Sequence, residues 1–242
     1  MSNYPHVVRY FTSWLENSII HIATELCSQN IESMLDNTTP LPSERTLMKL
    51  LKHMSKALNK LHKNDLVHLD IKPGNIVIDF KGKYKLCDFG LATHLNSEEE
   101  ISEIEEGDSK YLAEEMLEEQ KLNKIRSKKL DLRKADIFSL GMVVFGIIAK
   151  QQVEVPGAGP HWHNLRKGDL PELEHLPEYS RELKMLVRKM LHPDFRRRPT
   201  ASEVLQYIKV CERRELESNS VEQYPTPPAT KNPSDKLTST LF

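Results

Sequence analysis

The sequence predicts an α+β fold in which helices dominate, and three observations support this class. Short segments rich in β-branched and aromatic residues lie near the amino terminus. Segments with apolar residues three and four positions apart follow them and fill the second half of the chain. The chain has 242 residues, 38% of them hydrophobic and 29% charged, which is an ordinary globular composition. This order of strands, then helices, is typical of the α+β class.

Two pairs of strands are expected. Residues 7–11 and 19–24 carry the first pair, and the polar residues between them favour a turn. Residues 76–78 and 84–87 flank a Lys-Gly pair, and this arrangement predicts a hairpin.

Four longer helices are expected from the apolar spacing. The first begins after Ser43, which is suited to cap it, and ends before Asn64. The second is apolar on most sides over residues 137–148, so we expect it to be central and buried. The third covers residues 183–191, and a capping box at residues 200–203 opens the last.

Charge and cysteine content exclude several classes of protein. Lys and Arg total 34 and Asp and Glu total 35, so the net charge of −1 gives no support for a nucleic-acid partner. The three cysteines, Cys27, Cys87 and Cys211, fit neither a disulfide framework nor a four-ligand zinc site, and they indicate a reducing compartment. The longest apolar run, residues 140–149, is far shorter than the roughly 20 residues that span a bilayer. No signal peptide or membrane anchor is expected.

The most specific motif is His68-Leu69-Asp70-Ile71-Lys72-Pro73-Gly74-Asn75, followed thirteen residues after Asn75 by Asp88-Phe89-Gly90. These two elements, on either side of the expected hairpin, resemble the catalytic loop and the metal-binding turn of protein kinases. An isolated Asp is more often a helix cap or a surface residue, but the combination at this spacing favours descent from a kinase. The resemblance implies a structural role for His68.

The residue types fit phosphoryl transfer, which requires alignment and charge neutralisation rather than covalent chemistry by the protein. Asp70 is predicted to be catalytic, accepting a hydrogen bond from the attacking hydroxyl. Lys72 is predicted to place positive charge beside the transferred phosphate of ATP. Asn75 and Asp88 are predicted to bind Mg²⁺ and, through it, the nucleotide, because hard cations prefer oxygen ligands.

Other residues extend the resemblance to protein kinases. Asp136 lies where an Asp braces the catalytic loop, and Arg198 lies where an Arg pairs with the Glu that ends the activation segment, here Glu115. Upstream, residues 24–27 correspond to the hinge. The resemblance implies that Thr24 is the gatekeeper and that the backbones of Glu25 and Cys27 bind the adenine of ATP.

Several further segments resemble the Wee kinase family. They are residues 6–11, 106–113, 134–138, 162–171, and 192–194 with 197–199. Membership of that family implies phosphorylation of a tyrosine in a cyclin-dependent kinase, which restrains mitotic entry, and residence in the nucleus or cytoplasm. Lys72 and Pro73 are of the serine/threonine type, so the preference for tyrosine comes from the resemblance alone.

The resemblance implies three regions: a remnant of the small lobe with the hinge at 1–27, the large helical lobe at 28–211, and a disordered tail at 212–242. No Gly-rich loop and no strand Lys of the Val-Ala-Ile-Lys type occurs in the chain. We therefore expect the two first strands to have an unpaired, partly apolar edge and the chain to be incomplete for catalysis.

Three interpretations remain open at this point. The chain is a truncated form of an active kinase, a short product that acts as a non-catalytic binding module, or a phosphotransferase for small molecules. The first is favoured because every catalytic residue of the large lobe is present, and the activation segment disfavours the third.

The activation segment departs from the common kinase pattern. Leu69 stands where an Arg usually anchors a phosphate, and residues 98–108 are strongly acidic. We therefore expect this segment to be ordered without phosphorylation. The basic insert that follows, residues 121–134, either docks an acidic partner or is a solvated loop.

Overall fold

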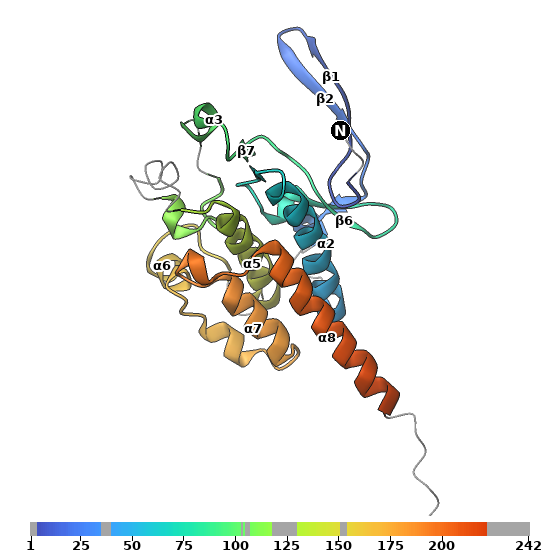
Figure 1. Ribbon diagram of the computed structural model, residues 1–242, viewed down its shortest axis with the longest axis vertical. Helices are drawn as coiled ribbons and strands as arrows, with labels where there is room; N and C mark the ends of the chain where they lie inside the picture. Colours follow the sequence, from blue (N-terminus) through green and yellow to red (C-terminus); the bar gives the residue numbers. More distant parts are fainter. Residues whose placement is uncertain are drawn as a thin grey trace, which may run out of the picture. The chain divides into compact units, whose positions relative to one another are not determined.

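We describe a computed structural model that covers residues 4–34, 40–102, 104, 107–117, 130–150 and 154–221. The chain through Ile208 forms one compact unit, and the chain from Lys209 onward forms a second unit. Strands occupy the early part of the first unit and helices the later part, so the predicted α+β class is confirmed (Figure 1).

The strands are β1 (Tyr10–Glu16), β2 (Ile19–Thr24), β3 (Gln29–Asn30), β4 (Leu66–Val67), β5 (Ile76–Ile78), β6 (Tyr84–Leu86) and β7 (Thr93–His94). The longer helices are α2 (Glu44–His62), α5 (Arg133–Ala149), α7 (Arg181–Met190) and α8 (Ala201–Val221). The shorter helices are α1 (Ile31–Met34), α3 (Glu98–Ser102) and α6 (Pro160–Arg166). The 3₁₀ turns are η1 (Pro73–Asn75), η2 (Glu114–Met116), η3 (Pro171–His175) and η4 (Phe195–Arg197).

The first hairpin, β1 with β2, is shifted from its predicted position. Asn17 and Ser18 form its two-residue turn with φ of 50° and 63°, in the left-handed region that such turns require. The strand predicted at residues 7–11 was therefore wrong in its bounds, because the hairpin begins at Tyr10. Val8 instead donates its N–H to the carbonyl of Leu86 in β6 at 2.9 Å.

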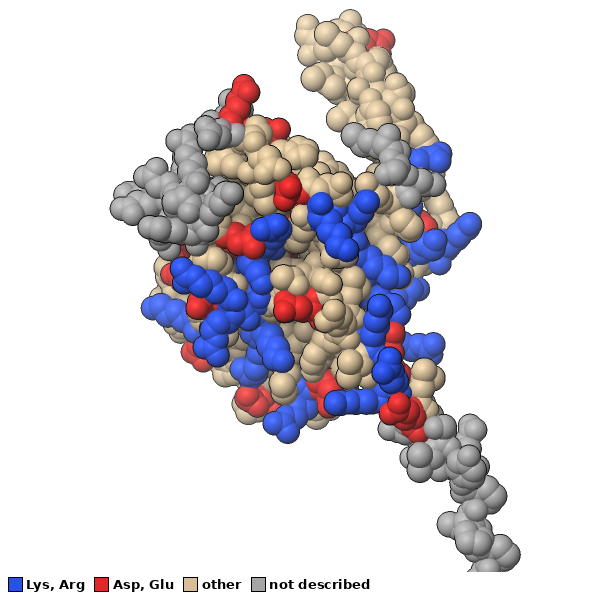
Figure 2. Space-filling model, viewed as in Figure 1, with Lys and Arg blue, Asp and Glu red and all other residues tan. Residues whose placement is uncertain are grey.

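This hairpin exposes apolar side chains. Every residue of β1 is exposed, and Trp14, Leu15 and Ile20 are 47%, 70% and 71% exposed. Within the described strands, β1 and β2 pair only with each other. The hairpin surface is mostly uncharged (Figure 2). The predicted apolar character of this hairpin is confirmed by these exposed side chains, and an exposed apolar strand favours pairing with another chain.

The predicted hairpin of β5 and β6 is confirmed, and it belongs to an antiparallel sheet in the order β3-β5-β6. Its turn contains Gly82 at φ 71°, a backbone conformation that glycine adopts without a steric penalty. The sheet brings Cys87, which follows β6, beside Asn75, the last residue of the predicted catalytic-loop motif.

Helices α2 and α5 carry much of the core. The side chain of Ser43 caps α2 by accepting a hydrogen bond from the N–H of Thr46, as predicted. The leucine face of α2 is buried and contacts β6 and α5. Helix α5 is buried over most of its length, because apolar residues surround it on nearly all sides. Gly141 allows α7 to approach, since a Cβ there would lie 3.0 Å from the Cβ of Met190.

The predicted capping box opens α8. The hydroxyl of Thr200 accepts a hydrogen bond from the N–H of Glu203, and the Glu203 carboxylate accepts one from the N–H of Thr200 at 2.7 Å. The hydrogen bonds that the Glu203 carboxylate accepts from the N–H and the hydroxyl of Thr200 lower the pKa of Glu203. The helix ends at Val221, later than the predicted start of the tail at 212, because residues 212–217 are mostly good helix formers. Residues 222–242 lie outside the described part of the chain. Among the described helices, none is long and apolar enough to cross a membrane.

Removing a buried leucine from α2 is expected to destabilise the first unit. Leu58 is fully buried, so Leu58→Ala should lower the free energy of unfolding by about 2–5 kcal/mol, measured by urea denaturation. Leu216→Ala is the matched control, because Leu216 is also helical but 71% exposed. Equal effects of the two substitutions would contradict the assignment of the core.

Stability is also expected to fall in mild acid. His53 on α2 accepts the N–H of Tyr84 through Nδ1 at 3.2 Å, and its ring centroid lies 4.2 Å from that of His6. Burial, helped by repulsion from His6, lowers the pKa of His53 to about 4. As pH falls from about 6.5 to about 4, the unfolded chain binds a proton that the folded chain does not. The stability that the neutral His53 contributes is thus fully present above about pH 6.5 and is lost as the pH falls toward about 4.

We expect the denaturation midpoint to decrease across this pH range. The midpoint of the His53→Asn variant should decrease less, because the amide oxygen of Asn can accept the same hydrogen bond without titrating. If the midpoints of both proteins fall in parallel, His53 is not the titrating group.

Candidate active site

A buried carboxylate holds the start of the predicted catalytic loop, which follows β4. The side chain of Asp136, on α5, accepts the N–H of His68 at 3.0 Å and the N–H of Leu69 at 2.9 Å. The Nε2 atom of His62 lies 2.8 Å from the same carboxylate. Leu69 has a φ of 63°, a conformation that costs a non-glycine residue roughly 1–2 kcal/mol. The predicted bracing role of Asp136 is therefore confirmed.

Three predicted site residues meet in this loop. The Asn75 amide nitrogen donates to the carboxylate of Asp70 at 2.8 Å and to its backbone carbonyl at 2.9 Å. The ammonium of Lys72 lies 2.9 Å from the same carboxylate oxygen of Asp70. The hydrogen bond to Asp70 raises the pKa of Lys72, so Lys72 is positively charged at neutral pH. A carboxylate thus lies between a cation and an amide.

Asp88 follows β6, and its neighbour Cys87 places it next to the cluster of Asp70, Lys72 and Asn75. The N–H of Cys87 donates to the carbonyl of Asn75 at 3.0 Å, which fixes the chain just before Asp88. Asp88 has a φ of 59° and accepts the N–H of Gly90 at 3.2 Å. Its carboxylate is exposed, and its charge contributes to the raised pKa of Lys72.

The side chains of Asn75 and Asp88 carry oxygen atoms that could bind Mg²⁺. The amide nitrogen of Asn75 is used by Asp70, which leaves its amide oxygen as the atom that can bind a cation. Within the described residues, no group of three or more His, Cys, Asp or Glu side chains could hold a metal. One carboxylate and one amide oxygen suit Mg²⁺, which keeps several waters and binds substrate phosphates.

His68 has the structural role that the resemblance implies. Its side chain is fully buried, its Nε2 lies 3.1 Å from the carbonyl of Cys87, and burial lowers its pKa. Its ring meets the ring of Phe89 edge to face.

Of the predicted hinge residues, Thr24 ends β2, whereas Glu25 and Cys27 lie in the irregular segment between β2 and β3. The N–H of Glu25 donates to the carbonyl of Arg9 at 2.8 Å, and the Glu25 carboxylate forms an ion pair with Lys85. Burial raises the pKa of the Cys27 thiol. No contact tests whether the backbones of Glu25 and Cys27 bind adenine, so that assignment stays a prediction.

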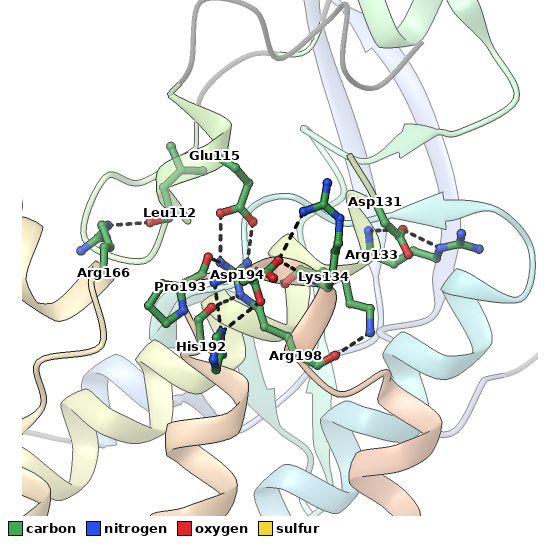
Figure 3. Close-up of polar contacts among 11 residues, drawn as sticks. Leu112, Glu115, Asp131, Arg133, Lys134, Arg166, His192, Pro193, Asp194 and Arg198 are labelled. Carbon is green, nitrogen blue, oxygen red and sulfur yellow. Dashed lines mark hydrogen bonds and ion pairs between the residues drawn. The ribbon is translucent and has the colours of Figure 1, made fainter. Parts of the chain in front are cut away.

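The predicted pair of Glu115 and Arg198 is confirmed (Figure 3). The two side chains are bidentate, with the Nη2 of Arg198 donating to Oε2 of Glu115 at 2.9 Å, and both are buried. Arg198 also donates to the carbonyl of His192, and Lys134 donates to the carbonyl of Arg198 at 2.6 Å.

Sequence reasoning missed other residues that shape the site. Nothing in the sequence distinguishes Lys85 from an ordinary strand residue, although it is buried and forms an ion pair with the partly buried Glu25. A Cβ on Gly107 would lie 2.7 Å from the carbonyl of Leu69, so glycine lets this segment approach the catalytic loop. Arg166 lies four residues after Trp162 on α6, and this helical spacing is the one sequence feature that could have indicated their contact. Residues 121–129 of the basic insert and residues 103, 105 and 106 of the acidic segment lie outside the described residues.

Comparison with known proteins identifies the fold that carries this site. The family model described as the protein kinase domain matches residues 1–208.

The chain belongs to the protein kinase family.

Within that family it is similar to Wee-type kinases. It is 38% identical over 202 residues to the Wee1-like protein kinase of Oryza sativa subsp. japonica, covering 84% of this chain and 35% of that protein. It is 34% identical over 205 residues to the membrane-associated tyrosine- and threonine-specific cdc2-inhibitory kinase wee-1.3 of Caenorhabditis elegans, covering 84% and 28%. Wee1-like protein kinase 2 of Homo sapiens is 32% identical over 229 residues, covering 84% and 38%.

The chain therefore spans about a third of the length of these curated relatives. The resemblance to the Wee kinase family that the sequence motifs predicted is confirmed.

Breaking the buried ion pair of this kinase domain is expected to be costly. Arg198→Met leaves the Glu115 carboxylate buried without its partner and should lower the free energy of unfolding by about 3–5 kcal/mol. The double variant Arg198→Met with Glu115→Gln should recover part of this loss, because no unpaired charge remains. Arg188→Met is the control, since its pair with the exposed Glu174 should contribute at most about 1 kcal/mol. Similar losses in the Arg188 and Arg198 variants, measured by urea denaturation, would contradict this account.

Proposed function

We propose that this protein kinase chain takes part in Mg²⁺-dependent phosphoryl transfer from ATP to a tyrosine of a cyclin-dependent kinase. Because these 242 residues contain no Gly-rich loop and no strand Lys, we expect the transfer to be slower than that of a complete kinase domain. The reaction would act in the nucleus or cytoplasm and restrain mitotic entry. The observation that carries the proposal is the contact of Asp70 with Lys72 and Asn75, next to the turn that presents Asp88. The names of the Wee-type relatives support the substrate class, since one is described as a cdc2-inhibitory kinase.

Each residue has a separate task in this reaction. The Asp70 carboxylate accepts a hydrogen bond from the tyrosine hydroxyl and orients its oxygen, while Asn75 fixes the carboxylate in place. The Lys72 ammonium stabilises negative charge that develops near Asp70. The oxygens of Asn75 and Asp88 would hold Mg²⁺, which neutralises the phosphates of ATP when it is bound. The backbones of Glu25 and Cys27 would hold the adenine.

The choice of tyrosine rests on the relatives rather than on the loop. Lys72 and Pro73 are of the serine/threonine type, whereas the relative from Caenorhabditis elegans is described as tyrosine- and threonine-specific. Phosphoamino-acid analysis of the product therefore tests the specificity separately from the reaction.

Replacing Asp70 is expected to remove most of the transfer. The chain is incubated with ATP, Mg²⁺ and a cyclin-dependent kinase complex, and phosphotyrosine is measured over time. Asp70→Asn should lower the rate by about 10²–10⁴-fold, because the amide is not a base. The substitution should leave the fold intact, since an Asn oxygen can still accept from Asn75.

Asp169→Asn is the control, because Asp169 is exposed and lies outside the site. Equal phosphotyrosine with the wild-type chain and with Asp70→Asn would refute the proposed function. Binding of the cyclin-dependent kinase without such transfer would favour the non-catalytic module instead.

A further inference from the structure

Arg166 is a buried cation that the proposed reaction does not use. It ends α6 and its side chain is only 1% exposed. Four backbone carbonyls accept hydrogen bonds from its guanidinium. The donors are Nε to Leu112 (2.9 Å), Nη2 to Ser109 (2.8 Å) and Lys110 (3.2 Å), and Nη1 to Trp162 (3.2 Å). Figure 3 shows Arg166 reaching Leu112 from its own helix.

Three of these four carbonyls belong to one short segment, residues 109–112. The indole of Trp162 donates to the carbonyl of Ser109 at 2.8 Å, so this oxygen has two donors from α6. The Arg166 guanidinium lies 3.6 Å from the centroid of the Trp162 ring, a distance that favours cation–π attraction. Arg166 and Trp162 together form what we call the α6 clamp.

The clamped segment, residues 109–112, follows a stretch of chain that packs against the catalytic loop. Gly107, two residues before Ser109, lies so close to the catalytic loop that a Cβ would be 2.7 Å from the Leu69 carbonyl; the same Cβ would be in van der Waals contact with the Asp70 carboxylate, at 3.4 Å. The charge of Asp108 contributes to the raised pKa of Lys72. A displacement of residues 109–112 would therefore also move Gly107 and Asp108. These residues lie beside the space through which a phosphate acceptor approaches Asp70.

The catalytic loop offers the activation segment no arginine that could bind a phosphate group on it. Leu69 is buried and stands where an Arg would grip a phosphorylated activation segment. Burial lowers the pKa of Arg166 to about 10, so its guanidinium is still charged at neutral pH. A permanent internal cation thus holds the carbonyls of this segment.

We propose that Arg166 is a positioning residue, which through the α6 clamp fixes residues 109–112 beside Asp70 and makes their order independent of phosphorylation. The role in presenting an acceptor rests on the proposed function, whereas the ordering of the segment does not.

Hydrogen–deuterium exchange of the full chain tests the ordering directly. The N–H groups of Lys110, Tyr111 and Leu112 are bonded to Asp108, so their exchange reports on the segment. Arg166→Met keeps the apolar length of the side chain but removes every donor, and these amides should exchange about tenfold faster or more. Arg166→Lys keeps the charge with fewer donors and should give an intermediate rate.

Controls separate this effect from general loss of stability. Arg188→Met removes an arginine that donates to the Leu170 carbonyl and pairs with Glu174, away from the segment, and should not change these amides. Trp162→Phe removes only the second donor to Ser109 and should accelerate exchange by a smaller factor, which keeps the test open if Arg166→Met does not fold. Phosphatase treatment of the wild-type chain should leave the exchange unchanged.

The kinetic measurement tests the positioning role. With a cyclin-dependent kinase as substrate, Arg166→Met should lower kcat/KM by about 10²-fold, while affinity for the magnesium nucleotide stays the same. Unchanged exchange at residues 110–112 in Arg166→Met and in Trp162→Phe would overturn the clamp, as would a loss of order after phosphatase treatment. If the wild-type chain transfers no phosphate, the proposed function fails, but the exchange rates still decide the clamp.

Discussion

The candidate site depends on one buried carboxylate, that of Asp136. It binds two successive N–H groups of the catalytic loop and contacts His62, so three donors share one anion in the core. These bonds offset the cost of the left-handed conformation of Leu69. That conformation turns the chain so that Asp70, the next residue, meets Lys72 and Asn75. The chemistry of the loop is therefore set by a helix that contributes no reacting atom.

Two buried arginines show how the large lobe accommodates charge. Arg198 meets a buried carboxylate in a bidentate pair, whereas backbone carbonyls accept the hydrogen bonds of Arg166. Both guanidinium groups approach the ring of Phe138, at 4.7 Å and 5.7 Å from its centroid. Buried charges are tolerated only where hydrogen bonds replace those to water, and these two residues use that requirement to fix loops. One fixes the end of the activation segment, and the other fixes the segment beside Asp70.

Several elements could be predicted because local chemistry decides them. The caps at Ser43 and Thr200, the leucine face of α2 and the β5–β6 hairpin depend on neighbouring residues, and all were found as expected. The first strand could not be placed, because residues 7 and 8 are equally suited to a hairpin and to pairing with β6. Hydrogen bonds of Leu86 in β6 with His6 and Val8 hold this segment against β6 instead of in the hairpin. Arg166 reads as a surface residue, and only its long-range acceptors explain its burial.

By itself, the sequence determined the types and spacing of the groups in the candidate site, because a loop that presents Asp70, Lys72 and Asn75 within six residues already limits where their side chains can lie. Tertiary structure alone decided which distant groups hold that loop and the segment facing it. Along the chain, Asp136 lies 67 residues from Leu69, Arg166 lies 54 residues from Leu112, and Gly107 lies 38 residues from Leu69. A buried hydrogen bond has no preferred separation along the chain, so packing of the helices, and not local propensity, selects these pairs.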